Sequence, residues 1–387
     1  MVYADYNSSS PLTSQVGAYL QKRLSGGGPY ANPNSLHHAG RQIMKKIEES
    51  RHICAEILGA KPEQILFNSG SSEGITSAFH SCCEYGRKNR KKHILISSIE
   101  HHAVIRTADY YSSKGFVITQ IPADSNGVTD AEYIKSFLRR KSKGVSLVSV
   151  MAANNETGVV QPYEKISAFC RENDVLYFCD TAQLIGKLPF NFEESGFDFA
   201  VVSGHKIGAL PGCGILLIKN PLLFTPLILG TIQEKGLRGG TQNYIGIETL
   251  AIALEDMKHS ISHIDLLRAS REKFEKNLKE KFPCLYIAGE IKERLPGTTL
   301  VSYPGIYGQA VQIELESRGI FVTTSSACLD NDPEPSHVLQ AMNVPDHIAR
   351  GAVRISLGGD DKGKDTYSRI FSGLCRAYER LTAIGSF

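Results

Sequence analysis

Short apolar runs alternate with amphipathic segments over the first two thirds of this chain, and that alternation constrains the fold most strongly. Apolar residues recur at helical spacing at 41–59, 73–86 and 102–115. Runs rich in Val, Ile and Leu predict buried strands at 64–70, 93–98, 116–121, 145–152, 175–180, 199–204 and 214–219. Because strands covered by helices on both faces are apolar almost throughout, the pattern predicts an α/β fold with a mostly parallel, seven-stranded sheet flanked by helices.

The pattern becomes irregular near residue 260, which predicts a second domain. Two helical runs at 242–260 and 263–282 are followed by strand-like and helical segments at 298–305, 308–319 and 320–325. A chain of 387 residues is also too long for one small core. We expect a large domain over 15–260 and a smaller α+β domain made of 1–14 and 261–387, with a polar loop at 323–336.

Composition excludes several classes of partner. The net charge is only +3, which gives no general attraction to nucleic acid or to membranes. No segment approaches the ~20 apolar residues of a membrane span. The nine cysteines are odd in number and form no CxxC pair, which argues against a disulfide framework and against a zinc site. We therefore expect a cytoplasmic protein with no metal site and no direct nucleic-acid or membrane partner.

Polar residues follow several of the predicted strands, where ligands of open α/β sheets collect. The string "SGSSEG" at 69–74 joins a strand to a helix, so its glycines and helix N–H groups could hold a phosphate. Helix capping by Ser71 or Ser72 is the simpler alternative. His101 and Asn155 also follow strands, where an imidazole could lie against a flat ring and an amide could donate to a phenolic oxygen. A helix-start histidine and a turn asparagine are the alternatives.

Lys206 stands in the most specific of these strings, "VVSGHKIG". A lysine at the inner end of an apolar strand loses solvation, which lowers its pKa and makes its amine nucleophilic. A surface lysine is the alternative, but Ser203 and His205 flank it and Asp180 follows the preceding strand, with Gln183 nearby. Together these residues supply the Schiff-base lysine, the pyridinium partner and the phosphate cradle that pyridoxal phosphate (PLP) requires.

Cys328 is unusual because it lies in a polar, proline-bearing loop, "TTSSACLDNDPEPS". Most free cysteines are small buried hydrophobes, whereas Ser, Thr, Asp, Asn and Pro favour turns. The reactive species is the thiolate, and partial exposure near cations favours it. The position of this thiol on a polar loop therefore requires an explanation other than core packing.

These strings resemble the cysteine desulfurases of the class V aminotransferase group, which have PLP fold type I. The resemblance extends from "ADYNSSSP" at 4–11 to "VRISLG" at 353–358. The matching strings occur in the family's order and spacing: "ANPNSLHHAG", "FNSGSSE", "EHHAV", "NNETGVVQP", "DTAQ", "GKLPF", "SGHKIG", "LRGGT", "SSACL", "EPSHVL" and "RISLG".

The resemblance implies a role for each candidate residue. Lys206, Cys328 and His101 are implied as catalytic, with Lys206 bound covalently to PLP and Cys328 accepting the substrate sulfur. The implied cofactor-binding set is Lys206, Asp180, Gln183, Asn155, Ser71, Ser72, Ser203, His205, Thr241 and His101. Arg354, Asn32 and Asn155 are implied to bind the substrate, since an arginine fork matches a carboxylate. Thr241 is implied to reach the phosphate of a neighbouring subunit, which predicts a homodimer.

The implied activity is conversion of L-cysteine to L-alanine, with a persulfide on Cys328 that passes to an acceptor protein. An iron–sulfur scaffold, a tRNA thiolation enzyme and a DNA phosphorothioation enzyme all remain open as acceptors. Selenocysteine lyase or a related PLP β-lyase is an alternative. A non-catalytic PLP-fold scaffold in a sulfur-transfer complex is another, although the joint presence of Lys206, Asp180, Cys328 and Arg354 argues against it.

Overall fold

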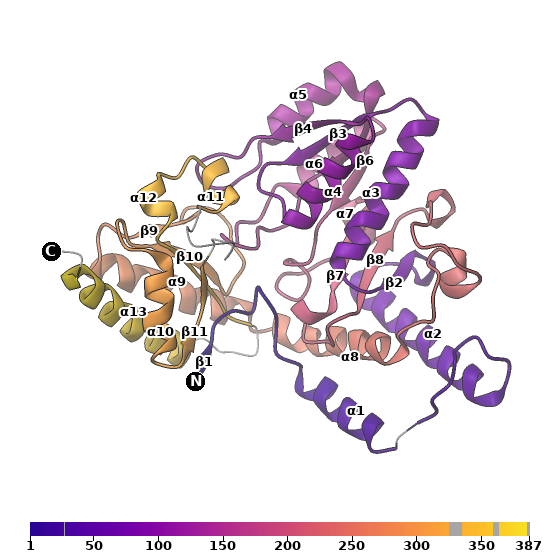
Figure 1. The fold of residues 1–387 in the computed structure, drawn as a ribbon, viewed down its shortest axis with the longest axis horizontal. Coiled ribbons are helices and arrows are strands. Elements are labelled where there is room, and N and C mark those ends of the chain that lie inside the picture. Colours follow the sequence, from indigo (N-terminus) through magenta and orange to yellow (C-terminus); the bar gives the residue numbers. More distant parts are fainter. Residues whose placement is uncertain (27, 325–334, 359–363, 385–387) are drawn as a thin grey trace.

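The computed structural model describes residues 1–26, 28–324, 335–358 and 364–384. Its centre is a seven-stranded sheet in the order β2-β8-β7-β6-β5-β3-β4 (Figure 1). The strands are β2 (Ile65–Asn68), β3 (His93–Ser97), β4 (Val117–Ile121), β5 (Val145–Ser149), β6 (Leu176–Cys179), β7 (Phe199–Ser203) and β8 (Gly214–Ile218). Each falls within a predicted run, so the predicted α/β fold with a mostly parallel sheet is confirmed.

Strand direction in this sheet has one reversal. β8 runs antiparallel to both of its neighbours, β2 and β7, whereas β7, β6, β5, β3 and β4 pair in parallel. β2 therefore points the same way as β7. The carboxyl ends of all strands except β8 meet at one edge of the sheet, which is where ligands bind in open α/β sheets.

Helices cover both faces of the sheet, as its apolar strands require. Alternate strand residues point to opposite sides: Leu66 and Phe178 join one apolar cluster, and Phe67 and Tyr177 join the other. The first cluster includes α3 (Ser71–Lys88) and α4 (His102–Ser113), and the second includes α2 (His38–Leu58), α5 (Ala131–Lys141), α6 (Tyr163–Glu172) and α8 (Tyr244–Ile261). Two further helices are α1 (Ser14–Leu24) and α7 (Phe192–Ser195).

A smaller unit follows α8 and has its own apolar cluster. Its antiparallel sheet has the order β12-β13-β10-β9. The elements of this part are α9 (Ile264–Lys281), β9 (Tyr286–Ile287), β10 (Thr298–Ser302), α10 (Gly308–Glu316), β11 (Ile320–Phe321), β12 (Thr323–Thr324), α11 (His337–Ala341), α12 (Asp346–Ala349), β13 (Ala352–Ser356) and α13 (Lys364–Ile384). The predicted domain boundary at 260/261 stays an interpretation.

The N-terminus belongs to this smaller unit at its start and reaches the large sheet a few residues later. β1 (Val2–Tyr3) pairs in parallel with β11, and Asp5 forms a bridge with Ser356. The chain then passes Lys206, and the backbone N–H of Thr13 donates to the backbone oxygen of Gly208. The first thirteen residues therefore connect the two sheets across the sheet edge that the parallel strands share.

None of the helices in the described ranges combines the length and the apolar character that a membrane span needs. The cysteines that the structure describes are free thiols, and most of them are buried. Within the same ranges, no group of three or more His, Cys, Asp and Glu side chains is placed to hold a metal ion.

Candidate active site

Polar side chains that follow five parallel strands line one cavity of about 280 Å³. Ser71, His101, Asn155, Asp180 and Lys206 follow β2, β3, β5, β6 and β7, respectively. The common strand direction explains why segments far apart in the sequence meet here. The remaining wall is formed by Asn7, Ser8, Met151, Ala153, Ala182, Gln183 and Arg354.

Lys206 ends a single 3₁₀ turn that follows β7. Its Nζ donates to the backbone oxygens of Asn7 (2.7 Å) and Ser8 (2.6 Å). Burial and the positive charge of Arg354 lower the pKa of Lys206 to about 8, although nearby carboxylates oppose the shift. A lowered pKa increases the fraction of this amine that is neutral near pH 8, and its role as a nucleophile stays a prediction.

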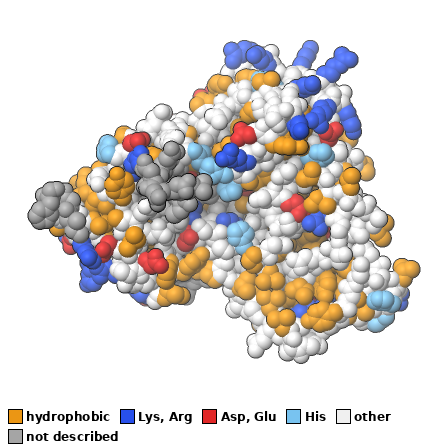
Figure 2. All heavy atoms as spheres, viewed as in Figure 1, with side chains coloured by type: hydrophobic (Ala, Val, Ile, Leu, Met, Phe, Trp, Pro, Cys, Tyr) orange, Lys and Arg blue, Asp and Glu red, His pale blue; other side chains and the backbone are white. Residues whose placement is uncertain are grey.

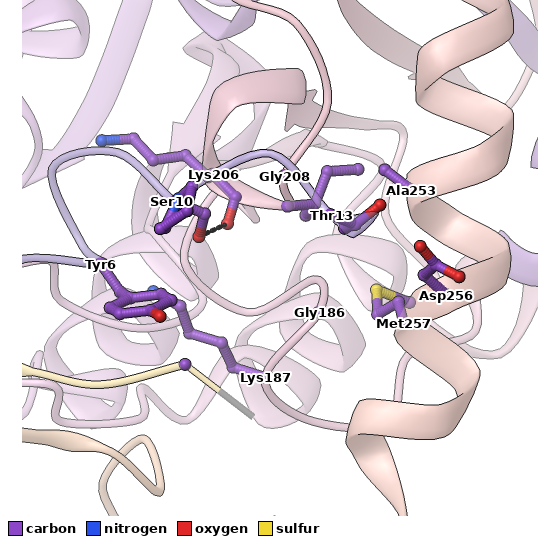
Figure 3. Close-up of a pocket in the computed structure, with 13 residues that line it drawn as sticks. Tyr6, Ser10, Thr13, Gly186, Lys187, Lys206, Gly208, Ala253, Asp256 and Met257 are labelled. Carbon is purple, nitrogen blue, oxygen red and sulfur yellow. Dashed lines mark hydrogen bonds between the residues drawn. The ribbon is translucent and has the colours of Figure 1, made fainter. Parts of the chain in front are cut away.

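Lys206 also borders a second, smaller pocket of about 70 Å³ (Figure 3). The figure shows Ser10, Thr13 and Gly208 beside the backbone of Lys206, with the side chains of Tyr6 and Lys187 below it. The Ser10 hydroxyl donates to the backbone oxygen of Lys206 (2.9 Å). The N-terminal segment thus holds both the backbone and the amine of this lysine.

Asp180 is the acidic residue of the cavity and is 8% exposed. Its Oδ1 accepts from the backbone N–H of Ala182 (3.0 Å), which fixes the carboxylate at the end of β6. Burial raises the pKa of Asp180, while its hydrogen bond and the positive charges of His101 and Lys206 oppose that rise. A cation placed against this carboxylate would therefore be stabilised by it.

His101 is the N-cap of α4, and its Nδ1 accepts from the backbone N–H of Ala103 (3.1 Å). In the neutral ring this assigns the proton to Nε2. Burial lowers the pKa of His101, and the negative charge of Asp180 partly offsets this effect. The capping alternative and the cavity role are therefore compatible, because capping uses only one ring nitrogen.

Arg354 reaches the cavity from the smaller sheet, where β13 pairs with β10 and β12. Its Nη1 donates to the backbone oxygen of Asn155 (2.9 Å), and its Nη2 donates to Asp5 Oδ1 (2.7 Å) and to Ser8 Oγ (2.5 Å). Its buried Nε has no hydrogen-bond partner among the described residues. The guanidinium is thus held in a fixed orientation, and one of its buried N–H groups is unpaired among the described residues.

The start of α3 offers a site for an anion. Gly70 caps the helix at φ 143°, no side chain caps the first turn, and a Cβ at Gly70 would have nothing within 4 Å. Ser203 and Asn68 flank Gly214 on the neighbouring strands, which places the end of β7 next to this turn. Exposed N–H groups at a helix start in open space suit a phosphate.

Several predicted site residues do not line the cavity. Ser72 is exposed on α3, Ser203 is buried beside the turn, and His205 Nδ1 lies 3.3 Å from Ser9 Oγ. Thr241 lines a separate pocket of about 150 Å³, together with Asn68 and Arg238.

Asn32 is a further candidate that does not line the cavity. The Oδ1 atom of Asn32 accepts from the backbone N–H of Asn34 (2.9 Å), so Asn32 takes part in a local turn. Cys328 lies outside the described residues.

Sequence reasoning missed the N-terminal contacts and Lys187. Asn7, Ser8 and Asp5 surround Lys206 and Arg354, and Lys187 donates to Asn7 Oδ1 (2.6 Å). A signal did exist, because "ADYNSSSP" and "GKLPF" belong to the strings that carry the resemblance. No residue within them was assigned a role.

A second missed group lies where the described chain resumes. Glu156 is buried, and burial raises its pKa to about 7 although Ser336 Oγ donates to its Oε2 (2.5 Å). His337 Nε2 lies 2.9 Å from the backbone oxygen of Glu100, and its ring centroid lies 4.5 Å from that of His102. Residues 336 and 337 are thereby fixed to the loops that follow β3 and β5.

Comparisons with known proteins agree with this geometry. The family model described as aminotransferase class-V matches residues 2–365. A protein named cysteine desulfurase IscS from Dictyoglomus turgidum is 35% identical, with 92% of this chain and 89% of that protein covered. A solved structure entitled NifS-like protein has a TM-score of 0.87 at 34% identity, covering 97% of this chain and 99% of that one. Another, entitled SspA in complex with cysteine, has a TM-score of 0.80 at 30% identity and covers 93% and 99%.

The matched segment contains the whole cavity, from Asn7 to Arg354. The chain therefore belongs to the cysteine desulfurase family, within the class V aminotransferases.

Proposed function

We propose that this protein is a PLP-dependent L-cysteine desulfurase that forms L-alanine and transfers the substrate sulfur to Cys328. The observation that carries the proposal is the meeting of Lys206, Asp180 and Arg354 at one cavity, although they come from three distant parts of the chain. A nucleophilic amine, a buried carboxylate and a guanidinium are the groups that PLP and an amino-acid substrate need. A relative solved in complex with cysteine supports the choice of substrate.

The residues present fit PLP. Lys206 would hold it covalently, Asp180 would pair with its pyridinium nitrogen, and His101 would stack on its ring. Asn155 and Gln183 would donate to its phenolic oxygen. The phosphate would lie at the uncapped start of α3, with Ser71, Ser72, Ser203 and His205 as its remaining predicted contacts. When bound, PLP supplies an electron sink for the electron pair left at the substrate Cα.

The chain's own side chains supply the other steps. Arg354 binds the substrate carboxylate, with Asn32 and Asn155 as further predicted contacts, and its orientation is set by Asp5 and by the backbone of Asn155. The Lys206 amine would accept the Cα proton, because its lowered pKa makes the neutral amine accessible near pH 8.

Cys328 is the proposed sulfur acceptor. Its thiolate attacks the substrate Sγ and the Cβ–S bond breaks. The bonding electron pair stays with Cβ, which takes up a proton, so that a persulfide forms on Cys328 and the three-carbon remainder leaves as alanine. The other cysteines are less suited: Cys54, Cys170, Cys179 and Cys213 are buried, and burial raises the pKa of each thiol. Cys284 is exposed but lies between α9 and β9 and does not line the cavity.

We further propose a homodimer in which Thr241 reaches the phosphate site of the partner. Large apolar side chains are exposed at the end of α1 and in the segments that follow α1 and β8, an arrangement typical of association surfaces. They include Leu24 (75%), Leu36 (88%), Leu222 (94%), Leu229 (82%) and Ile232 (72%). Figure 2 shows hydrophobic side chains gathered where Figure 1 has α1 and α8.

The acceptor of the persulfide sulfur is proposed to be a protein, either an iron–sulfur scaffold or a thiolation or phosphorothioation enzyme. The free, mostly buried thiols suit a reducing compartment, so the cytoplasm is the proposed location. Selenocysteine lyase or a related β-lyase is the rival function. These reactions differ from the proposed one because they need no protein thiol.

The first prediction concerns the pH dependence of cofactor attachment to Lys206. The pKa of Lys206 is lowered to about 8, so its neutral fraction should increase about tenfold between pH 7 and pH 9 and then level off. An ordinary lysine has a pKa of ~10.4, so its neutral fraction would still be increasing at pH 9. The initial rate of borohydride-reducible attachment of PLP to apo-protein should follow that curve. Lys206→Ala should form no such linkage, and the Lys219→Ala control should. A linkage mapped to another lysine in Lys206→Ala would contradict the assignment.

The second prediction concerns carboxylate binding by Arg354. Arg354→Lys keeps the positive charge but loses the two-pronged guanidinium, and one charge-assisted hydrogen bond is worth ~1.5–3 kcal/mol. Cysteamine lacks the carboxylate of L-cysteine. The preference for L-cysteine over cysteamine should therefore fall by roughly one to two orders of magnitude in this variant. Binding is measured by the change in visible absorption, and Arg318→Lys is the control. An unchanged preference would place the carboxylate elsewhere.

The third prediction concerns the thiol. Cys328→Ser should bind L-cysteine with the wild-type dissociation constant, because binding does not use the thiol. Its rate of alanine formation should fall by at least about two orders of magnitude, since the nucleophile is missing. Cys284→Ser is the control and should keep the wild-type rate. Wild-type alanine formation by Cys328→Ser would favour the β-lyase alternative.

A further inference from the structure

Lys187 lies beside the cavity without lining it. It follows Gly186 in the segment between β6 and α7, four residues after Gln183. Its Nζ donates to two amide oxygens, Asn7 Oδ1 at 2.6 Å and Gln183 Oε1. Figure 3 shows its side chain extending toward Tyr6, in the N-terminal segment that also holds Lys206.

The amide nitrogens of Asn7 and Gln183 also have hydrogen-bond partners. Asn7 Nδ2 donates to the backbone oxygen of Asn155 (3.1 Å) and to Thr298 Oγ1 (3.2 Å), so its oxygen must face Lys187. Gln183 Nε2 donates to the backbone oxygen of Asn7 (2.9 Å). Turning the Gln183 amide over would set its N–H groups against the N–H groups of Lys187 and its oxygen against a carbonyl oxygen. The network therefore permits one orientation of this amide.

That orientation leaves one N–H of Gln183 unused by these bonds, and Gln183 lines the cavity. We propose that Lys187 is a positioning residue that holds the Gln183 amide so that its second N–H faces the phenolic oxygen of the bound cofactor. The inference rests on the proposed function, because it takes PLP as the ligand of the cavity.

The state of the amine is compatible with this role. Burial lowers the pKa of Lys187, and the positive charges of Lys206 and Arg354 lower it further. A neutral amine still has two N–H groups, one for each of its two oxygen acceptors. A neutral Lys187 also adds no positive charge next to Lys206.

The consequence is a measurable property of the cofactor before any substrate is added. A hydrogen-bond donor to the phenolic oxygen stabilises the negative charge on that oxygen. This negative charge is fully developed when the bound chromophore has lost its proton, so the donor favours the deprotonated state. If the Gln183 amide is free to turn, that stabilisation weakens. The pH midpoint of the visible absorption should then move upward.

The experiment titrates the visible absorption of PLP-loaded protein without substrate. In Lys187→Met the midpoint should rise by roughly half to one pH unit, which corresponds to one neutral hydrogen bond. Gln183→Met should show a similar rise, and the double variant should show no additional one, because both changes remove the same contact. Lys45→Met, on the exposed face of α2, is the matched control and should leave the midpoint unchanged.

Thermal unfolding of the apo-proteins shows whether each variant folds. If Lys187→Met does not, Lys187→Gln keeps a polar side chain at the position, but this side chain is one bond shorter, so its N–H groups stop short of the two oxygens and the midpoint should also rise. Lys187→Arg keeps the donors and should restore the wild-type value.

An unchanged midpoint in a folded, PLP-loaded Lys187 variant would overturn the inference, as would shifts that add in the double variant. Either result would leave the proposed function intact if the wild type makes alanine. A wild type that binds no PLP would overturn both.

Discussion

The shared direction of the strands on either side of β8 is the constraint on which the cavity depends. Because β2, β3, β5, β6 and β7 all end at one edge, the residues that follow them are delivered to the same place. Lys206 and Asp180 follow the adjacent strands β7 and β6. The closely packed sheet thus sets the position of the reactive amine relative to the buried carboxylate before any ligand binds.

The N-terminal segment completes what the sheet cannot provide. Residues 1–13 start beside β11, pass the guanidinium of Arg354 and end beside Gly208. Backbone oxygens of Asn7 and Ser8 accept from the Lys206 amine, and Asp5 pairs with Arg354. Three basic side chains, Lys206, Arg354 and Lys187, can lie close together with little or only partial exposure because this segment supplies acceptors to each.

The sequence predicted those parts of the structure that depend on local pattern. All seven strands of the large sheet were predicted, and so was the clustering of His101, Asp180 and Lys206, because both follow from apolar runs and from the geometry of parallel sheets. The segment 320–325 was predicted as one strand, yet it divides into β11 and β12, which pair with different partners. Arg354 and the N-terminal contacts join residues more than 140 positions apart, so no local pattern contains them; only the resemblance indicated Arg354.

The central claim is that the substrate sulfur leaves the cavity on Cys328, and the position of that sulfur tests it most directly. Wild-type protein loaded with PLP would receive L-cysteine carrying labelled sulfur, followed by an alkylating agent and digestion without reductant. The label should be found as an alkylated persulfide on the peptide containing "SSACLDNDPEPS", in step with alanine formation. Label on the peptide of Cys213 or Cys284, or label released as free sulfide without any protein-bound persulfide, would contradict it.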